Sequence, residues 1–371
     1  MVRTPQSYRI SLMADISLIR SGAPLDFRQQ LKLTVQLSWP AMMAQLSSIM
    51  MQYIDAAMVG RLGADDSAAV GLVSTSLWLF WGICSAVTVG FSVQVAHRIG
   101  ASDHDGARRV LRQSIVACLL FSLAVVMIGA AIAWPLPHWL GGTDVVCPKA
   151  SLYFLVFVLA LPLLTMNYLG GAMLRCVGNM KVPGGLNVMM CVLDIIFNFF
   201  LIFPSREVGV LGHAFHLPGA GLGVLGAALG TVSAEIVTAG LMMWYLCARE
   251  KSICLVGHPG SFRPTRQVLA RALKVSAPMT LEHAVICGAQ IAVTVIVAPL
   301  GVMAIAANAF AVTAESICYM PGYGIGDAAT TLVGQSYGAK RLDVARRFGY
   351  ITVGLGMVTM TLMGVVMYIC A

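Results

Sequence analysis

Six acidic side chains fall inside long apolar stretches of the sequence, and they are the groups best placed to do chemistry there. They are Asp55, Asp194, Glu235, Glu282, Glu315 and Asp327. An ionised acid at membrane depth costs about 2.5–3.5 kcal/mol even on a lenient insertion scale. Because the same stretches hold no Lys or Arg, each acid must reach water, bind a cation or hold a proton. Such groups can exchange H⁺ or Na⁺ and can balance the charge of a cationic ligand.

The spacing of polar residues arranges some of these acids into stripes. Gln45, Ser48, Gln52 and Asp55 share one face of a helix, as do Asn187, Asp194 and Asn198. We expect the two stripes to meet inside one helix bundle. Two alternatives stay open: the amides serve only as interhelical hydrogen bonds, and Asp55 is an interfacial acid beside a short outer loop.

Residues 320–327 combine one proline with three glycines and end on Asp327. This composition predicts a broken or kinked helix whose exposed backbone lines a transport path. The alternative is a glycine face that packs closely against a neighbouring helix.

The elements that must position these groups are membrane helices. The chain has 371 residues, of which 58% are hydrophobic and 11% charged, and its mean hydropathy is +0.82. This composition excludes a soluble enzyme, a disordered chain and a secreted disulfide module, and the scattered bases do not suggest nucleic-acid binding. Runs of about 20 apolar residues predict nine spans, at Leu33–Met58, Ala68–Ala96, Ile115–Leu136, Leu152–Met173, Pro183–Phe203, Gly223–Cys247, Val275–Ala298, Ala304–Val333 and Tyr350–Cys370.

Basic residues alternate between the connections and so predict orientation. All but three of the 24 Lys and Arg residues fall on one side, the exceptions being Arg61, Lys149 and Arg206. The positive-inside rule then places residues 1–32 in the cytoplasm. No cysteine pair has CxxC spacing, and the H-x-x-H at His213 and His216 is a weak metal signal. Most histidines fall in predicted loops: His97, His104, His138, His213, His216 and His258. We therefore expect no cofactor and no metal centre.

An internal repeat divides the chain. Residues 38–109 align without a gap to residues 276–347, and both copies carry a loop of the form G-A-x-x-x-D-x-A-R-R that starts at Gly100 and at Gly338. We expect Gly to end one helix, Asp105 and Asp343 to cap the next, and the arginines to anchor it at the interface. Six spans separate the copies, so the halves run parallel, as in transporters with a midplane site. The predicted architecture is an all-α polytopic membrane protein with a complete six-helix lobe (33–247), a cytoplasmic linker (248–274) and half of a second lobe (275–371, three helices), so we expect a chain truncated at its C-terminus.

These motifs resemble the multidrug and toxic compound extrusion (MATE) family, of the NorM and DinF-like kind. The resemblance rests on Ile54–Gly63, on Leu174–Asn179, on Val192–Asn198 and on the two repeated loops. It implies two six-helix lobes and antiport of H⁺ or Na⁺ against cationic, aromatic drugs.

The resemblance also implies roles for individual residues. Asp55 and Asp194 match the first-lobe carboxylate pair that members of the archaeal and DinF-like type use for proton coupling, and Thr231 matches a nearby sixth-helix hydroxyl. Glu282 is the candidate for a seventh-helix acid, although it lies about one turn nearer the proline than the NorM pattern has it. Met51 and Met190 stand where archaeal members have polar residues, and a tenth-helix acid has no counterpart. We expect Gln52, Asn198, Thr231, Glu235, Gln290, Glu315, Tyr323 and Asp327 to line the substrate cavity.

The sequence thus predicts a monomeric multidrug efflux antiporter of the inner membrane, without enzymatic activity. One alternative is a lipid-linked precursor flippase, which would need bases in its cavity. A second is an intramembrane enzyme in which Asp194 and Asp327 imitate an aspartyl pair. A third is an inactive fragment.

Overall fold

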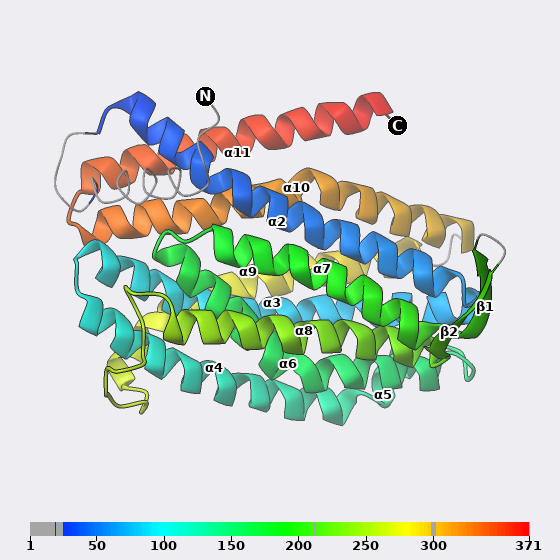
Figure 1. Ribbon diagram of the computed structural model, residues 1–371. Coiled ribbons are helices and arrows are strands. Elements are labelled where there is room, and N and C mark those ends of the chain that lie inside the picture. The colour runs from blue at the N-terminus through cyan, green and yellow to red at the C-terminus, as the bar shows by residue number, and fades with distance from the viewer. Residues whose placement is uncertain (1–18, 20–24, 211–212, 298–301, 371) are drawn as a thin grey trace.

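The computed structural model describes residue 19 and residues 25–210, 213–297 and 302–370, and these ranges form a bundle of long helices (Figure 1). Nine helices of 22 residues or more occur in this part of the chain: α2 (Phe27–Gly60), α3 (Ala64–Gly100), α4 (His104–Ile132), α6 (Cys147–Cys176), α7 (Lys181–Ile202), α8 (Gly223–Ala248), α9 (Arg266–Val297), α10 (Val302–Gly338) and α11 (Leu342–Cys370). A short helix, α5 (Pro135–Trp139), follows α4.

The nine predicted spans fall on these nine helices, and the all-α membrane fold is confirmed. Most helices extend beyond the predicted apolar run because their polar ends continue the helix. Six of the described helices are long and apolar enough by themselves to cross a membrane: α3, α4, α6, α7, α8 and α11. The other three, α2, α9 and α10, carry internal prolines and polar residues.

In the described residues, a β-hairpin and the short helix α5 are regular elements that the sequence did not predict. Strands β1 (Pro204–Val210) and β2 (His213–Ala220) pair antiparallel between α7 and α8. The hairpin lies at one end of the bundle, and the segment that joins α8 to α9 lies at the other (Figure 1).

The histidine assignments need correction as well. His97 lies in α3, His104 begins α4, His138 lies in α5, and His213 and His216 lie in β2, so these five are not loop residues. In the described residues, no group of three His, Cys, Asp or Glu side chains could hold a metal ion.

Backbone geometry supports the internal repeat. Ser102 and Lys340 occupy matching positions of the two loops, and both have a positive φ, 59° and 60°. The amide nitrogens of both residues donate to the carbonyl three residues earlier, at Ile99 and Tyr337. The two loops therefore end their helices in the same way, with one residue in the left-handed region.

The two repeats also meet symmetrically. Gly100 at the end of α3 lies against the backbone of Gln335, and Gly338 at the end of α10 lies against the backbone of His97. Gln335 is the repeat partner of His97. The pseudo-two-fold axis that relates the two repeats therefore converts each of these contacts into the other. A Cβ atom at either glycine would collide with backbone, which explains why both copies keep glycine there.

The loop caps differ from the prediction. Asp103, and not Asp105, is the N-cap of α4, and its Oδ1 accepts a 2.8 Å hydrogen bond from the Gly106 amide. Asp105 and Asp343 lie in the first turns of α4 and α11. In the first copy, Arg108 also contacts the Cys254 carbonyl and Asp105.

Of the break or kink predicted for the eighth span, the break is wrong. Helix α10 runs unbroken from Val302 to Gly338 and includes Pro321. Proline removes one helical hydrogen bond, and packing against a neighbour can offset that loss. Gly324 supplies such packing, since a Cβ there would collide with the backbone of Ala41 and Met42 in α2. The close-packing alternative holds at Gly324, whereas a Cβ at Gly326 would meet nothing within 4 Å.

Candidate functional site

Two acids from different helices converge on one amide inside the bundle. Asn198 of α7 donates from Nδ2 to Oδ1 of Asp55 at 2.8 Å and to Oδ2 of Asp194 at 3.1 Å. Asp194 and Asn198 are fully buried, and Asp55 is half-buried. The carboxyl groups of Asp55 and Asp194 are close enough to hydrogen-bond to each other. The stripes on α2 and α7 therefore meet, as their spacing predicted, and Asp55 is a member of this cluster and not an isolated interfacial acid.

Helix α8 closes this cluster from the other side. Gly230 lies directly under the Asn198 amide, where any Cβ would overlap Oδ1. Thr231, the next residue, is a neighbour of the Asp194 carboxyl. Two buried oxygens of the cluster, Asp194 Oδ1 and Asn198 Oδ1, have no hydrogen-bond partner among the described residues. Buried oxygens that lack a donor can accept from a bound proton or bind a small cation.

Tyr153 is a neighbour that the sequence reading missed. It lies on α6 and interacts electrostatically with both Asp55 and Asp194. Nothing in the local sequence marks this tyrosine, because α6 approaches the cluster only through tertiary packing. Gln52, which the stripe on α2 also includes, is exposed and has no described contact with the acids.

A second buried acid lies on α8 near the first cluster. Glu235 is 2% exposed, and its Oε1 accepts a 2.7 Å hydrogen bond from Nδ2 of Asn167 in α6. Its other oxygen, Oε2, has no partner among the described residues, and neither does Asn167 Oδ1. Glu235 is therefore buried against α6 and does not face an open cavity.

Asp327 has a basic partner, contrary to the sequence reading. Arg175 lies in the last turn of α6, just beyond the predicted apolar run, and its Nε is 3.3 Å from Asp327 Oδ1. A cavity of about 20 Å³ adjoins this ion pair and is also lined by Gln45 and Asn187. Because Asp327 forms an ion pair with Arg175, the aspartyl pair of Asp194 and Asp327 that an intramembrane enzyme would need does not form.

The remaining predicted residues lie between α9 and α10. Gln290 and Glu315 line a cavity of about 270 Å³, together with Ala289, Val293, Ala311 and Val312. Tyr323 is 53% exposed and interacts electrostatically with Glu282, which is also exposed. The structure thus separates Glu282 from the Asp55 and Asp194 cluster.

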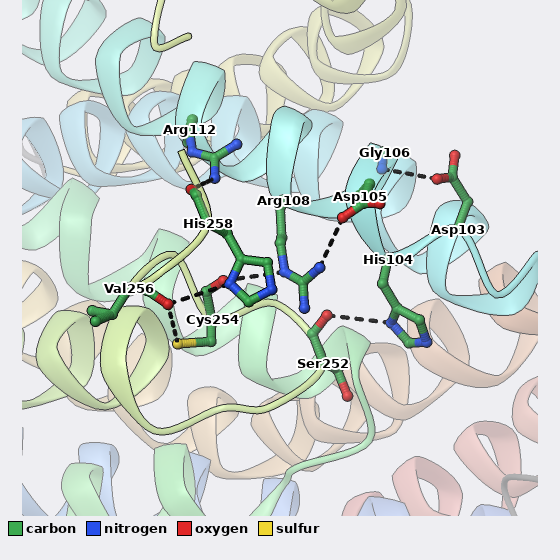
Figure 2. A network of polar contacts seen from close by, with 10 residues as sticks. All are labelled: Asp103, His104, Asp105, Gly106, Arg108, Arg112, Ser252, Cys254, Val256 and His258. Carbon is green, nitrogen blue, oxygen red and sulfur yellow. Dashed lines mark hydrogen bonds and ion pairs between the residues drawn. The ribbon is translucent and has the colours of Figure 1, made fainter. Parts of the chain in front are cut away.

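A further polar network holds the segment between α8 and α9 against α4 (Figure 2). Arg108 donates from Nε to the Cys254 carbonyl at 3.1 Å, and Arg112 donates to the His258 carbonyl. His104 contacts the Ser252 carbonyl at 3.2 Å, and Arg108 also pairs with Asp105 at 2.8 Å. The first-copy arginines thus fasten the linker, which the sequence pattern did not reveal.

The fold and the buried acids define a multi-pass membrane protein of the transporter class. The MatE family model matches residues 40–200 and 278–371, and the chain belongs to this family, whose members are transporters and not enzymes. The chain is 24% identical over 360 residues to a probable multidrug resistance protein NorM of Neisseria meningitidis, covering 95% of this chain and 75% of that protein. It is 28% identical over 342 residues to one of Pseudomonas aeruginosa, covering 90% and 66%.

Solved structures show the same fold. A MATE protein in complex with MaL6 superposes with a TM-score of 0.80 at 22% identity, covering 93% of this chain and 72% of that one. An outward-facing multidrug resistance MATE transporter of the MOP superfamily gives a TM-score of 0.77 with the same identity and coverage.

Proposed function

We propose that the chain exports cationic, aromatic compounds across the inner membrane as a monomeric antiporter, with Asp55 and Asp194 as the site of the coupling cation. The observation that carries this proposal is the bridge from Asn198 to both carboxyl groups, deep in a membrane bundle. Two acids so close together, without a base among their described contacts, repel each other unless a cation lies between them. Binding of H⁺ or Na⁺ there would be linked to release of a positively charged substrate.

The names of the relatives support the substrate class, since NorM proteins are described as multidrug resistance proteins. The cavity beside Glu315 and Gln290 supports it as well, because it combines apolar walls with one carboxylate, which suits an apolar cation. In the proposed cycle this cavity binds the drug, and the Asp55 and Asp194 cluster binds the coupling ion. The two lobes, residues 33–247 and 275–371, would move relative to each other about the linker.

The proposed orientation places the basic end of the bundle in the cytoplasm. Helices α3 and α8 end there, α4 and α11 begin there, and the linker lies at the same end (Figure 1). A flippase is less well supported, because the base that lines an internal cavity, Arg175, is already paired with Asp327.

The test is ethidium transport in proteoliposomes, driven by an imposed pH gradient or by an imposed Na⁺ gradient. We expect Asp194→Asn to abolish transport while Asp65→Asn, an exposed acid in the first turn of α3, retains it. The gradient that drives transport identifies the ion. Unchanged transport by the Asp194→Asn chain would contradict the proposal.

A further inference from the structure

The side chains of Glu235 and Asn167 share one hydrogen bond and leave two buried oxygens without a donor. Asn167 Nδ2 donates to Glu235 Oε1 at 2.7 Å. The remaining oxygens of the same two groups, Glu235 Oε2 and Asn167 Oδ1, are buried and have no partner in the described part of the chain. Both are acceptors when Glu235 is ionised, so neither can satisfy the other.

One added proton would allow both oxygens to form a hydrogen bond. A proton on Oε2 makes that atom a donor, and the amide oxygen of Asn167 is the acceptor on the facing group. The acid and the amide would then be joined by two hydrogen bonds in place of one. A metal cation fits less well, because such ions need more oxygen ligands than this pair presents.

In the described part of the chain, Glu235 forms no ion pair with a base. Helices α6, α7, α2 and α3 pack around α8. The described titratable groups that they bring to this region include Tyr168, Tyr153, Asp194, Asp55 and Cys84. Helix α6 carries two bases, and both are paired elsewhere: Lys149 with Asp66 and Arg175 with Asp327. Arg175 also interacts electrostatically with Tyr168. Among the described residues, the Glu235 carboxyl is therefore hydrogen-bonded to the Asn167 amide and is not paired with a positive charge.

Glu235 also lies close to the proposed coupling site along α8. Thr231, the neighbour of Asp194, precedes it by four residues, so the two side chains share one face and are about 6 Å apart along the helix axis. Glu235 is the nearer of the two to the C-terminal end of α8, the end where the linker begins.

We propose that Glu235 and Asn167 form a second proton-binding site, one helical turn from the Asp55 and Asp194 cluster. The proposal rests on the proposed function. It adds an internal proton-binding site through which a proton can pass between that cluster and the linker end of the bundle. Glu235 holds the proton on Oε2, and Asn167 accepts from it and donates to Oε1.

The chain contains a matched control in a second Glu and Asn pair. Asn179 Nδ2 donates to Glu250 Oε2 at 3.0 Å, and both residues are buried. Neither residue is left with an unpartnered buried oxygen in the described structure. Glu250 therefore has no unpartnered buried oxygen that a proton would satisfy.

The test is infrared difference spectroscopy of the purified chain in lipid nanodiscs, following the carbonyl band of protonated carboxylic acids through a pH titration. We expect Glu235→Gln to remove the band of one carboxylic acid and Asn167→Ala to shift that band, while Glu250→Gln changes neither. If Glu235→Gln leaves every band in place, the proposal is wrong. A band that disappears when NaCl replaces KCl would also overturn it, in favour of a sodium site.

This readout needs no transport. Loss of the Glu235 band in a chain whose Asp194→Asn variant still transports ethidium would support the second site while contradicting the proposed coupling role of Asp194. Variants that do not fold are identified by size-exclusion chromatography, and Asn167→Ala leaves the Glu235 carboxyl in place as an independent probe.

Discussion

Arg175 and Asp327 form an ion pair between the end of α6 and the middle of α10, with 3.3 Å between Nε and Oδ1. Two hydrogen bonds lie next to it: Thr331 donates to the Arg175 carbonyl at 2.9 Å, and Gln335 donates to the Cys176 carbonyl at 2.7 Å. Helix α10 is thus joined to the C-terminal end of α6 by one charged contact and two neutral ones. Separation of α10 from α6 at this point requires that all three contacts break.

Asp327→Asn should therefore destabilise the chain by about 1–3 kcal/mol, because it leaves a partly buried guanidinium without its acid. The measurement is thermal unfolding in detergent with a thiol-reactive dye, which reports on buried cysteines such as Cys118 and Cys176. The double variant Arg175→Gln with Asp327→Asn should recover part of the loss, since no unpaired charge remains. A melting temperature for Asp327→Asn equal to that of the parent chain would show that the ion pair contributes nothing.

Gly230→Ala should impair transport nearly as much as Asp194→Asn. The new methyl group would occupy the position of Asn198 Oδ1 and move the amide away from the two acids. The control is Gly240→Ala on the same helix, where a Cβ has nothing within 4 Å. Ethidium transport in proteoliposomes measures both. Equal transport by the two variants would mean that the position of Asn198 is not important.

Gly100→Ala and Gly338→Ala should destabilise the chain to a similar extent, by about 1–3 kcal/mol each, because each would force two helix ends apart. Gly71→Ala in α3 and Gly326→Ala in α10 are matched controls, since both sites are open. Thermal unfolding in detergent measures all four. A large effect at only one of the repeated glycines would argue against the pseudo-symmetric contact.

Asp103→Ala should cost about 1 kcal/mol through loss of the N-cap of α4. The hydrogen bond from the Gly106 amide, together with the Arg98 guanidinium, holds the pKa of the Asp103 carboxyl below its ordinary value of 3.8. A lowered folded-state pKa means that this stabilisation is present above pH 3.8 and is lost as the pH falls through the folded-state pKa. The difference in melting temperature between the two chains should therefore shrink in acid, and a difference that grows there would refute the assignment.

Arg112→Gln should release the linker from α4. Arg112 is buried, donates to the His258 carbonyl and lies against Gly260, where a Cβ would overlap its guanidinium. Loss of a charged donor costs about 1.5–3 kcal/mol, so trypsin should cut at Lys251 or Arg263 roughly tenfold faster or more. Arg109→Gln, at an exposed position, is the control. An unchanged cleavage rate would show that the linker is held by other contacts.

Much of the fold could be predicted from the sequence, for reasons that are local. Membrane helices satisfy their own backbone hydrogen bonds, so the nine apolar runs are sufficient to locate them. The helix-ending glycines were also predictable, because Gly100 and Gly338 end their helices within the repeated loop. Side-chain spacing along α2 and α7 placed Asp55 and Asp194 on inward stripes, since helical periodicity fixes which residues share a face.

What the sequence could not determine were the contacts between helices. Nothing local indicates that Tyr153 lies beside the acids, that Arg175 neutralises Asp327, or that Gly324 packs against α2 tightly enough to keep α10 unbroken across Pro321. Glu235 was recognisable as a buried acid, but its pairing with Asn167, 68 residues away, was not. Helical periodicity specifies the face that a residue occupies. Only the packing of helices distant in the chain decides which group that face meets, and that contact determines whether an acid holds a proton, a cation or a salt bridge.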